Sequence, residues 1–113
     1  MSKVNKITPL TNVKYLNLYE LEAENKFGKT HPYYVASRKD SQHMMAATKK
    51  ADPDGCIIYS VFGENHDKVI MIRQFRFPLN SYVYEFPAGL IDPGESARET
   101  AIREMMEETG LSF

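Results

Sequence analysis

Residues 89–111, GLIDPGESARETAIREMMEETGL, decide the fold of this chain. A Pro-Gly pair near the start of the stretch predicts a turn. Ser96 followed three residues later by Glu99 is the pattern of a capping box, which marks the beginning of a helix. Gly110 is typical of the residue that ends one. The sequence therefore predicts a loop followed by a short helix that begins at about Ala97.

The expected helix has two different sides. At about 100° per residue, three carboxylates fall on one side and three apolar residues point away from it. The two sets are Glu104, Glu107 and Glu108, and Ile102, Met105 and Met106. The acids repel one another, and two of them lie in the last turn, where the helix dipole disfavours negative charge. Either a hard cation such as Mg²⁺ or Mn²⁺ offsets this cost, or the acids form an ordinary solvated face.

The spacing of these residues resembles the Nudix box of the Nudix hydrolases. Five residues separate Gly89 from Glu95, and seven more precede the run REMMEETGL at 103–111. In that family the loop and helix bind a divalent metal, Mg²⁺ or Mn²⁺, that polarises a diphosphate. The resemblance implies these metal ligands: Glu104, Glu107, Glu108 and the backbone carbonyl of Ala88. It also implies catalytic roles for Arg103, Glu107 and Glu108, and structural roles for Gly89, Gly110 and Glu95, which would fix Arg103.

The family's fold is an α/β/α sandwich. The resemblance therefore implies an α+β protein, the N-terminal part of such a sandwich, with a mixed sheet, the loop–helix–loop and a preceding antiparallel hairpin. Two regions are expected: 1–45, an N-terminal hairpin used in dimerisation, and 46–113, the first portion of the Nudix domain. Family members continue with more strands and a second helix, so we expect such elements beyond residue 113 or from another chain.

Strands are expected at several places before the helix. Stretches rich in Tyr, Leu and Val at 13–24 and 32–38, with a turn at 25–29, predict an antiparallel hairpin. Residues 41–51 fit either a linker or a short strand. The β-branched runs 55–62 and 68–75 predict a central hairpin, and a loop at 77–81 leads into a further strand at 82–86.

A narrower resemblance concerns the substrate. Residues 73–78, RQFRFP, and 85–92, EFPAGLID, are similar to the ADP-ribose pyrophosphatase group. That group splits ADP-ribose into AMP and ribose 5-phosphate. By this resemblance Arg76 contacts the diphosphate, which a planar guanidinium can hold through paired hydrogen bonds, and Glu85 supports the substrate or metal site. The alternatives are an exposed arginine at a strand end and a surface carboxylate.

The N-terminal hairpin resembles the same group less closely. In that group the hairpin exchanges across a homodimer and stacks aromatic rings on adenine. Aligned on residues 28–30, Tyr15 and Tyr33 correspond to stacking aromatics, and Arg38 to a basic substrate contact. A tyrosine ring can stack on a purine, but these tyrosines are equally consistent with ordinary strand residues.

Composition limits the function classes. The chain has 113 residues, one domain at most, and a net charge of -1, which gives no electrostatic case for nucleic acid or an anionic membrane. Cys56 is the only cysteine, so no intrachain disulfide can form and a reducing compartment is favoured. No apolar run approaches the length of a membrane span. We therefore expect a cytoplasmic protein.

Three functions remain open at this stage. The first is metal-dependent hydrolysis of ADP-ribose, and the second is hydrolysis of another nucleotide sugar. The third is a non-catalytic Nudix module that acts in dimerisation or binding. The general base also stays open: in this family it is often a glutamate beyond the box, and Glu107 or Glu108 is the alternative within it.

Overall fold

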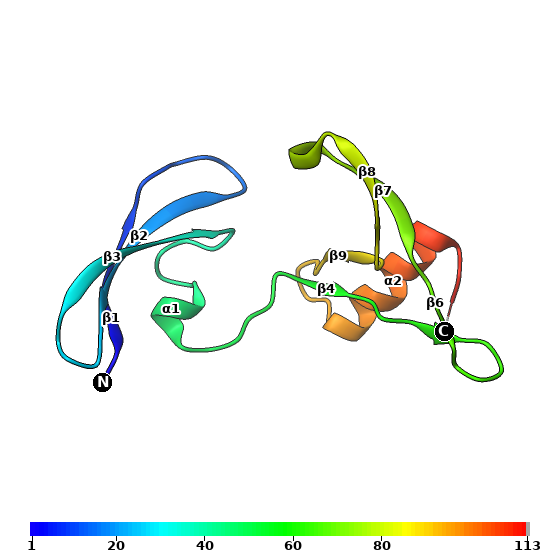
Figure 1. Ribbon diagram of the computed structural model, residues 1–113, viewed down its shortest axis with the longest axis horizontal. Coiled ribbons are helices and arrows are strands. Elements are labelled where there is room, and N and C mark those ends of the chain that lie inside the picture. Colours follow the sequence, from blue (N-terminus) through cyan, green and yellow to red (C-terminus); the bar gives the residue numbers. More distant parts are fainter. Residues whose placement is uncertain (113) are drawn as a thin grey trace. The chain divides into compact units, whose positions relative to one another are not determined.

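The computed structural model describes residues 1–112, which form two compact units, Met1–Asp52 and a second that begins at Pro53 (Figure 1). The elements of the first unit are β1 (Lys3–Pro9), β2 (Asn17–Glu24), β3 (Thr30–Ser37) and α1 (Met45–Thr48). Those of the second are β4 (Gly55–Ile57), β5 (Val61–Phe62), β6 (Lys68–Val69), β7 (Ile72–Arg76), η1 (Phe77–Leu79), β8 (Ser81–Glu85), β9 (Ala88–Leu90) and α2 (Ala97–Thr109).

The first unit is a three-stranded antiparallel sheet in the order β1-β2-β3. The predicted N-terminal hairpin is confirmed as β2 and β3, which pair from Asn17 opposite Ser37 to Glu24 opposite Thr30. Its turn is held by the Asn25 side chain, which accepts hydrogen bonds from the amides of Phe27 and Lys29. Strand β1, which the sequence analysis did not predict, pairs with the other edge of β2.

A single helical turn follows the sheet at Met45–Thr48, so the short-strand alternative predicted for 41–51 is wrong. The carboxylate of Asp40 accepts hydrogen bonds from the amides of Gln42 and His43, and this turns the chain into α1. Met44, directly before α1, is buried together with Tyr19 and Leu21 of β2. The helical turn therefore begins directly after one of the three buried apolar side chains of this unit.

The strands of the second unit pair differently from the prediction. Only the inner ends of 55–62 and 68–75 form a hairpin, β5 with β6, while β4 pairs with β9 and β7 pairs with β8. The single central hairpin is therefore wrong. Strand β7 pairs with β8 because the short helix η1 is their only connection. Asn80 has the left-handed conformation that this tight reversal of the chain needs. The predicted strand at 82–86 is confirmed as β8, and every ladder in the described residues is antiparallel.

The predicted helix is confirmed as α2, with both of its ends. The Ser96 hydroxyl oxygen accepts a hydrogen bond from the amide of Glu99 (3.1 Å), and Gly110 ends the helix at φ 74° with its amide bonded to the carbonyl of Met106. The helix packs against β4 and β9 (Figure 1). These caps fix where the helix begins and ends, and therefore which residues face the loop of 89–96.

Only part of the predicted apolar side of α2 is buried. Met105 is 2% exposed and Ile102 is partly buried, whereas Met106 is 50% exposed. Neighbouring residues on a helix point about 100° apart, and the short β4–β9 pair is too narrow to cover both methionines. Thr100 is buried together with Met105 on the covered side of the helix, and none of its surface is exposed.

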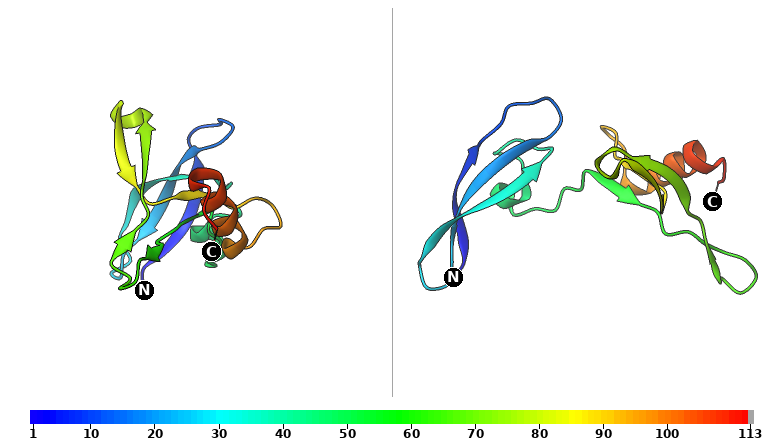
Figure 2. Two further views of the ribbon diagram at one scale, coloured as in Figure 1. Left: turned by 90° about the vertical axis from the view of Figure 1, so that its right-hand side faces the viewer. Right: turned by 45° about the horizontal axis from the view of Figure 1, so that its top comes forward.

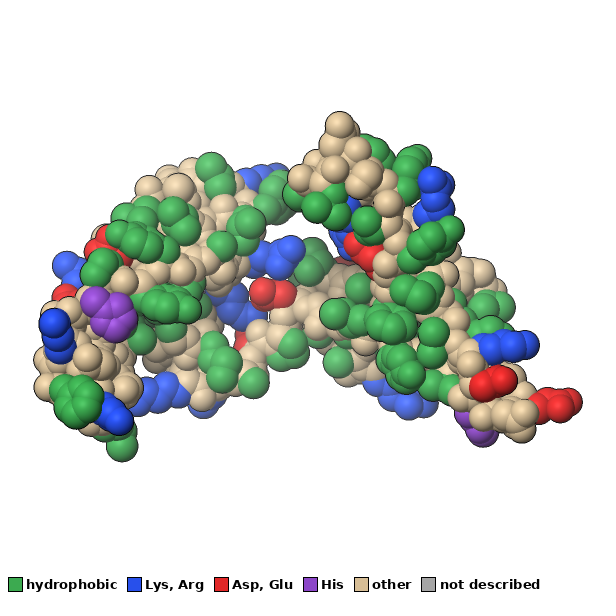
Figure 3. Space-filling view, in the orientation of Figure 1, with side chains coloured by type: hydrophobic (Ala, Val, Ile, Leu, Met, Phe, Trp, Pro, Cys, Tyr) green, Lys and Arg blue, Asp and Glu red, His purple; other side chains and the backbone are tan. Residues whose placement is uncertain are grey.

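The remaining strands of the second unit carry much apolar surface. The β7–β8 hairpin extends beyond α2 and the β4–β9 pair, with η1 at its tip (Figure 2). Hydrophobic side chains are visible over the surface of this unit (Figure 3). The most exposed are Ile57, Tyr59, Phe77 and Tyr84. None of the helices in residues 1–112 has the length and apolar character required to cross a bilayer.

Candidate functional site

The pair of Glu95 and Arg103 lies at the centre of the loop–helix. The Arg103 guanidinium donates from Nε to Glu95 Oε2 and from Nη2 to Glu95 Oε1, both at 2.9 Å. These charge-assisted bonds lower the pKa of Glu95 from 4.5 to about 2, and they raise that of Arg103. Because a guanidinium has a rigid planar shape, two parallel bonds fix its orientation as well as its position.

The other edge of Arg103 meets the acids of α2. Nη1 donates to Glu104 Oε1 at 2.8 Å and to Glu107 Oε2 at 3.2 Å. Nη2 also donates to the carbonyl of Leu90 at 3.1 Å, which ties the helix to β9. One cation therefore offsets part of the repulsion between the helix carboxylates and joins them to the loop.

Glu104 lies directly against Gly89. A Cβ atom built on Gly89 would lie 2.1 Å from Glu104 Cδ and 2.3 Å from its Oε1. Strand β9 therefore leaves just enough room for the glutamate at the position where glycine has no side chain. Cys56, which pairs with Gly89 across β4 and β9, has a raised pKa because of its burial and the negative charge of Glu104.

Glu108 has a different environment. Its Oε2 accepts a hydrogen bond from the backbone amide of Ala88 at 3.3 Å. Burial raises the pKa of Glu108, the Ala88 amide opposes this, and the negative charge of Glu104 raises it further. Arg76 acts in the opposite direction and lowers the pKa of Glu108. The positive charge of Arg76 therefore acts on the Glu108 carboxylate.

Arg76, the last residue of β7, forms an ion pair with Glu85, the last residue of β8. Nε of Arg76 donates to Glu85 Oε1 at 2.6 Å, and Nη2 donates to Glu85 Oε2. The pairing lowers the pKa of Glu85 and raises that of Arg76. Only one edge of the guanidinium is used, so Glu85 holds Arg76 in a fixed orientation with its Nη1 still able to donate.

The donor chemistry of α2 fits a hard divalent cation. The contacts described above use one oxygen of each of Glu104, Glu107 and Glu108, and every carboxylate has two. Oxygen donors of this kind are what Mg²⁺ and Mn²⁺ prefer. Within residues 1–112, however, no three acidic, histidine or cysteine side chains lie close enough together to form a ready-made metal site. An ion would have to draw the carboxylates towards one another.

Three of the predicted substrate residues lie in the first unit. Tyr15 stands in the connection between β1 and β2 and is 75% exposed, whereas Tyr33 lies on β3 and is 58% exposed. Arg38 is exposed directly after β3. The acids and Arg76 all belong to the second unit. Both rings are thus largely exposed, and the Lys14 ammonium lies over the Tyr15 ring, 5.1 Å from its centroid.

Thr100 is a site residue that the sequence analysis missed. Its hydroxyl donates to Glu95 Oε1 at 2.6 Å, and its side chain is fully buried under the loop. Neither the capping pattern nor the spacing of the carboxylates specifies the residue at position 100. Its place three residues before Arg103, on the side of the helix that faces the loop, is the signal that could have indicated it.

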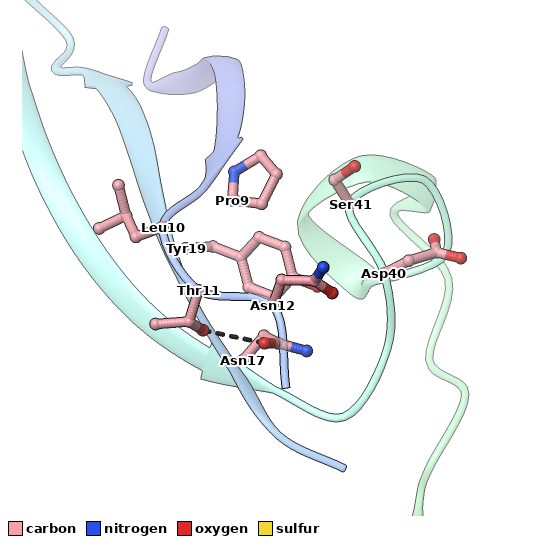
Figure 4. A pocket seen from close by; sticks show the side chains of 8 residues that line it. All are labelled: Pro9, Leu10, Thr11, Asn12, Asn17, Tyr19, Asp40 and Ser41. Atoms are coloured by element: carbon pink, nitrogen blue, oxygen red, sulfur yellow. Dashed lines mark hydrogen bonds between the residues drawn. The ribbon is translucent and has the colours of Figure 1, made fainter. Parts of the chain in front are cut away.

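A cavity of about 590 Å³ lies in the first unit, between the β1–β2 connection and the turn before α1. The Tyr19 ring lies at its centre, among Pro9, Asn12 and Ser41 (Figure 4). The hydroxyl of Tyr19 donates to the carbonyl of Lys39, and that of Thr11 donates to the side chain of Asn17. Much of the polar lining is thus already engaged within the unit.

Comparison with known proteins gives consistent matches. A family model described as NUDIX domain matches residues 51–113, more than half of the chain. The ADP-ribose pyrophosphatase of Bacillus subtilis is 31% identical over 99 residues, which cover 88% of this chain and 45% of the relative. Putative nudix hydrolase 2 of Caenorhabditis elegans is 40% identical over 83 residues, 73% of this chain and 37% of the relative. The mouse ADP-sugar pyrophosphatase is 54% identical over 46 residues, 41% of this chain and 21% of the relative.

A solved structure has the same fold. The crystal structure of an ADP compounds hydrolase superposes with a TM-score of 0.69 over 98% of this chain and 52% of that one, at 23% sequence identity. The chain spans about half or less of the length of these curated relatives and of that structure. The match over residues 51–113, together with the glycine, arginine and glutamate arrangement of the loop and α2, shows that this chain belongs to the Nudix family.

Proposed function

We propose that this protein takes part in metal-dependent hydrolysis of a nucleoside diphosphate linked to a second group, with ADP-ribose as the substrate and AMP and ribose 5-phosphate as the products. The observation that carries the proposal is the arrangement around Arg103. One guanidinium fixed by Glu95 holds Glu104 and Glu107, and Glu104 lies against Gly89 of β9. The B. subtilis relative, named an ADP-ribose pyrophosphatase, supports the choice of substrate.

Glu104, Glu107 and Glu108, with the carbonyl of Ala88, are the groups that would hold Mg²⁺ or Mn²⁺. When bound, such an ion screens the charge of the phosphate oxygens and lowers the pKa of an attacking water. Arg103 keeps two of these carboxylates on the loop side of α2. Gly89 leaves the space that Glu104 fills. The role of the chain is therefore to place negative oxygen donors against a rigid backbone.

Arg76 is proposed to bind the diphosphate. Glu85 holds its Nε and Nη2, and Nη1 remains able to donate to a phosphate oxygen. A cation that is oriented before the substrate arrives loses less conformational entropy on binding, and it places positive charge where negative charge accumulates in the transition state. Glu85 thus acts on the substrate through Arg76.

Further parts of the proposal concern the rest of the protein. Glu107, Glu108 or a glutamate outside this chain would serve as the general base. Tyr15 and Tyr33 would stack on adenine and Arg38 would contact the substrate, with the N-terminal strands joining two copies in a homodimer in the cytoplasm. The exposed rings of both tyrosines support the stacking role.

A hydrolysis assay on the full-length protein tests this function. ADP-ribose is supplied with Mg²⁺ or Mn²⁺, or with a chelator, and release of AMP is measured. We expect metal-dependent turnover that falls by about 100-fold in Glu108→Gln, because a ligand to the ion is lost. Glu99→Gln, in the first turn of the same helix and exposed, is the matched control and should retain activity.

Other outcomes would change the proposal. Equal turnover with and without the chelator would rule out a metal role. No turnover of ADP-ribose by the full-length protein would leave a binding module. The mouse relative, named an ADP-sugar pyrophosphatase, favours a second candidate, hydrolysis of another ADP-sugar. A panel of nucleotide sugars separates the two candidates by their kcat/KM values.

A further inference from the structure

Thr100 is the most deeply buried polar residue of the second unit, and none of its surface is exposed. It lies in the first half of α2, directly under the loop that carries Glu95. A threonine inside a helix commonly donates its hydroxyl to the carbonyl four residues earlier. Here the Ser96 carbonyl lies at 3.0 Å, but Glu95 Oε1 lies closer, at 2.6 Å.

A hydroxyl has one proton, so Thr100 can donate strongly to only one of these oxygens. The carboxylate is the shorter and charged acceptor, and hydrogen bonds to charged acceptors are the stronger ones. The Ser96 carbonyl already receives the backbone amide of Thr100 at 2.9 Å. The proton of Thr100 is therefore directed to Glu95.

Glu95 Oε1 accepts hydrogen bonds from three donors. Thr100 approaches it at 2.6 Å and Arg103 Nη2 at 2.9 Å, while Oε2 receives Arg103 Nε. The amide of Asp92 adds a longer bond to Oε1 at 3.3 Å. With its carboxylate held by Thr100 from below, Glu95 cannot rotate without breaking a buried bond. Arg103 thus has a fixed partner on one edge and meets Glu104 and Glu107 with the other.

We propose that Thr100 is a positioning residue, which locks the Glu95 carboxylate and thereby sets the place of Arg103 and of the two α2 carboxylates beside it. The step from Arg103 to metal binding rests on the proposed function, whereas the step from Thr100 to Arg103 does not. Thr100 touches neither substrate nor ion. Its effect passes through Glu95 alone.

The test uses the full-length protein and its Thr100→Val variant, which keeps the shape of the side chain and removes the hydroxyl. The first measurement is made without metal: the Arg103 Nε–H signal in ¹H–¹⁵N NMR, assigned with Arg103→Lys. In the wild type this proton is held by Glu95 and should exchange slowly with water. In Thr100→Val we expect a shifted signal and about tenfold faster exchange, and Thr100→Ser should restore the wild-type behaviour.

The second measurement is Mn²⁺ affinity by calorimetry. Partners behind the metal ligands usually affect affinity by 10–100-fold, so we expect a loss of about tenfold in Thr100→Val and recovery in Thr100→Ser. Thr109→Val is the matched control: the Thr109 hydroxyl donates to the carbonyl four residues earlier on α2, that of Met105 at 2.6 Å, and to no carboxylate. This control should change neither the Arg103 signal nor the affinity.

The outcomes separate the two proposals. If Thr100→Val leaves the Arg103 signal as it is in Thr109→Val and only lowers the melting temperature, Thr100 is an ordinary helix residue and the inference is wrong. If the signal responds as expected but the wild type binds no Mn²⁺, the positioning of Arg103 stands and the proposed function fails. Should Thr100→Val not fold, Thr100→Ala provides the same measurement.

Discussion

Replacing Gly89 with alanine should displace Glu104. The new Cβ would lie 2.1 Å from Glu104 Cδ and a similar distance from its Cγ and Oε1, whereas carbon atoms in contact prefer about 3.5–4.0 Å. The glutamate would therefore have to move by more than about 1 Å. Such a shift breaks its 2.8 Å bond with Arg103. Overpacking of this kind costs about 1–3 kcal/mol, so Gly89→Ala should lower the free energy of unfolding by that amount.

A double-mutant cycle isolates the cause, because the three atoms nearest to the new Cβ all belong to Glu104. In the Glu104→Ala background those atoms are gone. Gly89→Ala should then be neutral, or stabilising by up to about 1 kcal/mol through the smaller entropy of the unfolded chain. Urea unfolding followed by circular dichroism of the wild type, both single variants and the double variant gives the coupling energy. An equal cost of Gly89→Ala in both backgrounds would refute the steric explanation.

Three further predictions concern Glu95, Met105 and Cys56. The pKa of Glu95 falls from 4.5 to about 2 on folding. Its contribution to stability is therefore present above about pH 4.5 and is lost as the pH falls towards 2. When the free energy of unfolding is measured against pH, the wild type should lose its advantage over Glu95→Gln across that range. Met105→Ala should lower the free energy of unfolding by about 2–5 kcal/mol, because Met105 is 2% exposed. Met106→Ala, at a position that is 50% exposed, should lower it by well under half as much in the same urea experiment. Equal losses would contradict the burial of Met105 in the core. Cys56 should react slowly with a thiol reagent at about pH 7, because burial and the charge of Glu104 raise its pKa. Glu104→Gln should speed the reaction. An unchanged rate would count against an effect of Glu104 on the thiol.

The helix α2 could be predicted from the sequence because its signals are local. Ser96, Glu99 and Gly110 act on residues within one turn of themselves, and the structure uses them as caps. The β2–β3 hairpin was predictable for the same reason, since Asn25 and Gly28 make a turn between adjacent stretches. Both elements depend on contacts between residues close in sequence.

The pairing of the central strands could not be predicted in this way. Strand β4 pairs with β9, about thirty residues later, and nothing in the pattern of residues 55–57 distinguishes that partner from the nearer run at 68–75. The tight connection through η1 decides the competition by pairing β7 with β8. Tertiary pairing thus overrode the order in the sequence.

The candidate site was predictable in its residue types and less so in its contacts. The spacing of Glu95, Arg103 and Glu104 indicated the carboxylate and guanidinium cluster that the structure contains. It did not indicate Thr100, whose role depends on burial, nor the ion pair of Arg76 with Glu85, two residues that are not opposite each other in the β7–β8 register and meet only through their side chains. The spacing of residues predicts which of them share one side of a helix, but it does not predict which other residues pack against that side.

The most direct test of the metal site is a crystal structure of the full-length protein grown with Mn²⁺ and measured at a wavelength where manganese scatters anomalously. The account predicts one anomalous peak beside the C-terminal half of α2, about 2.1 Å from oxygen atoms of Glu104 and Glu108. A well-ordered α2 that shows no peak, or a peak at another place in the protein, would contradict it.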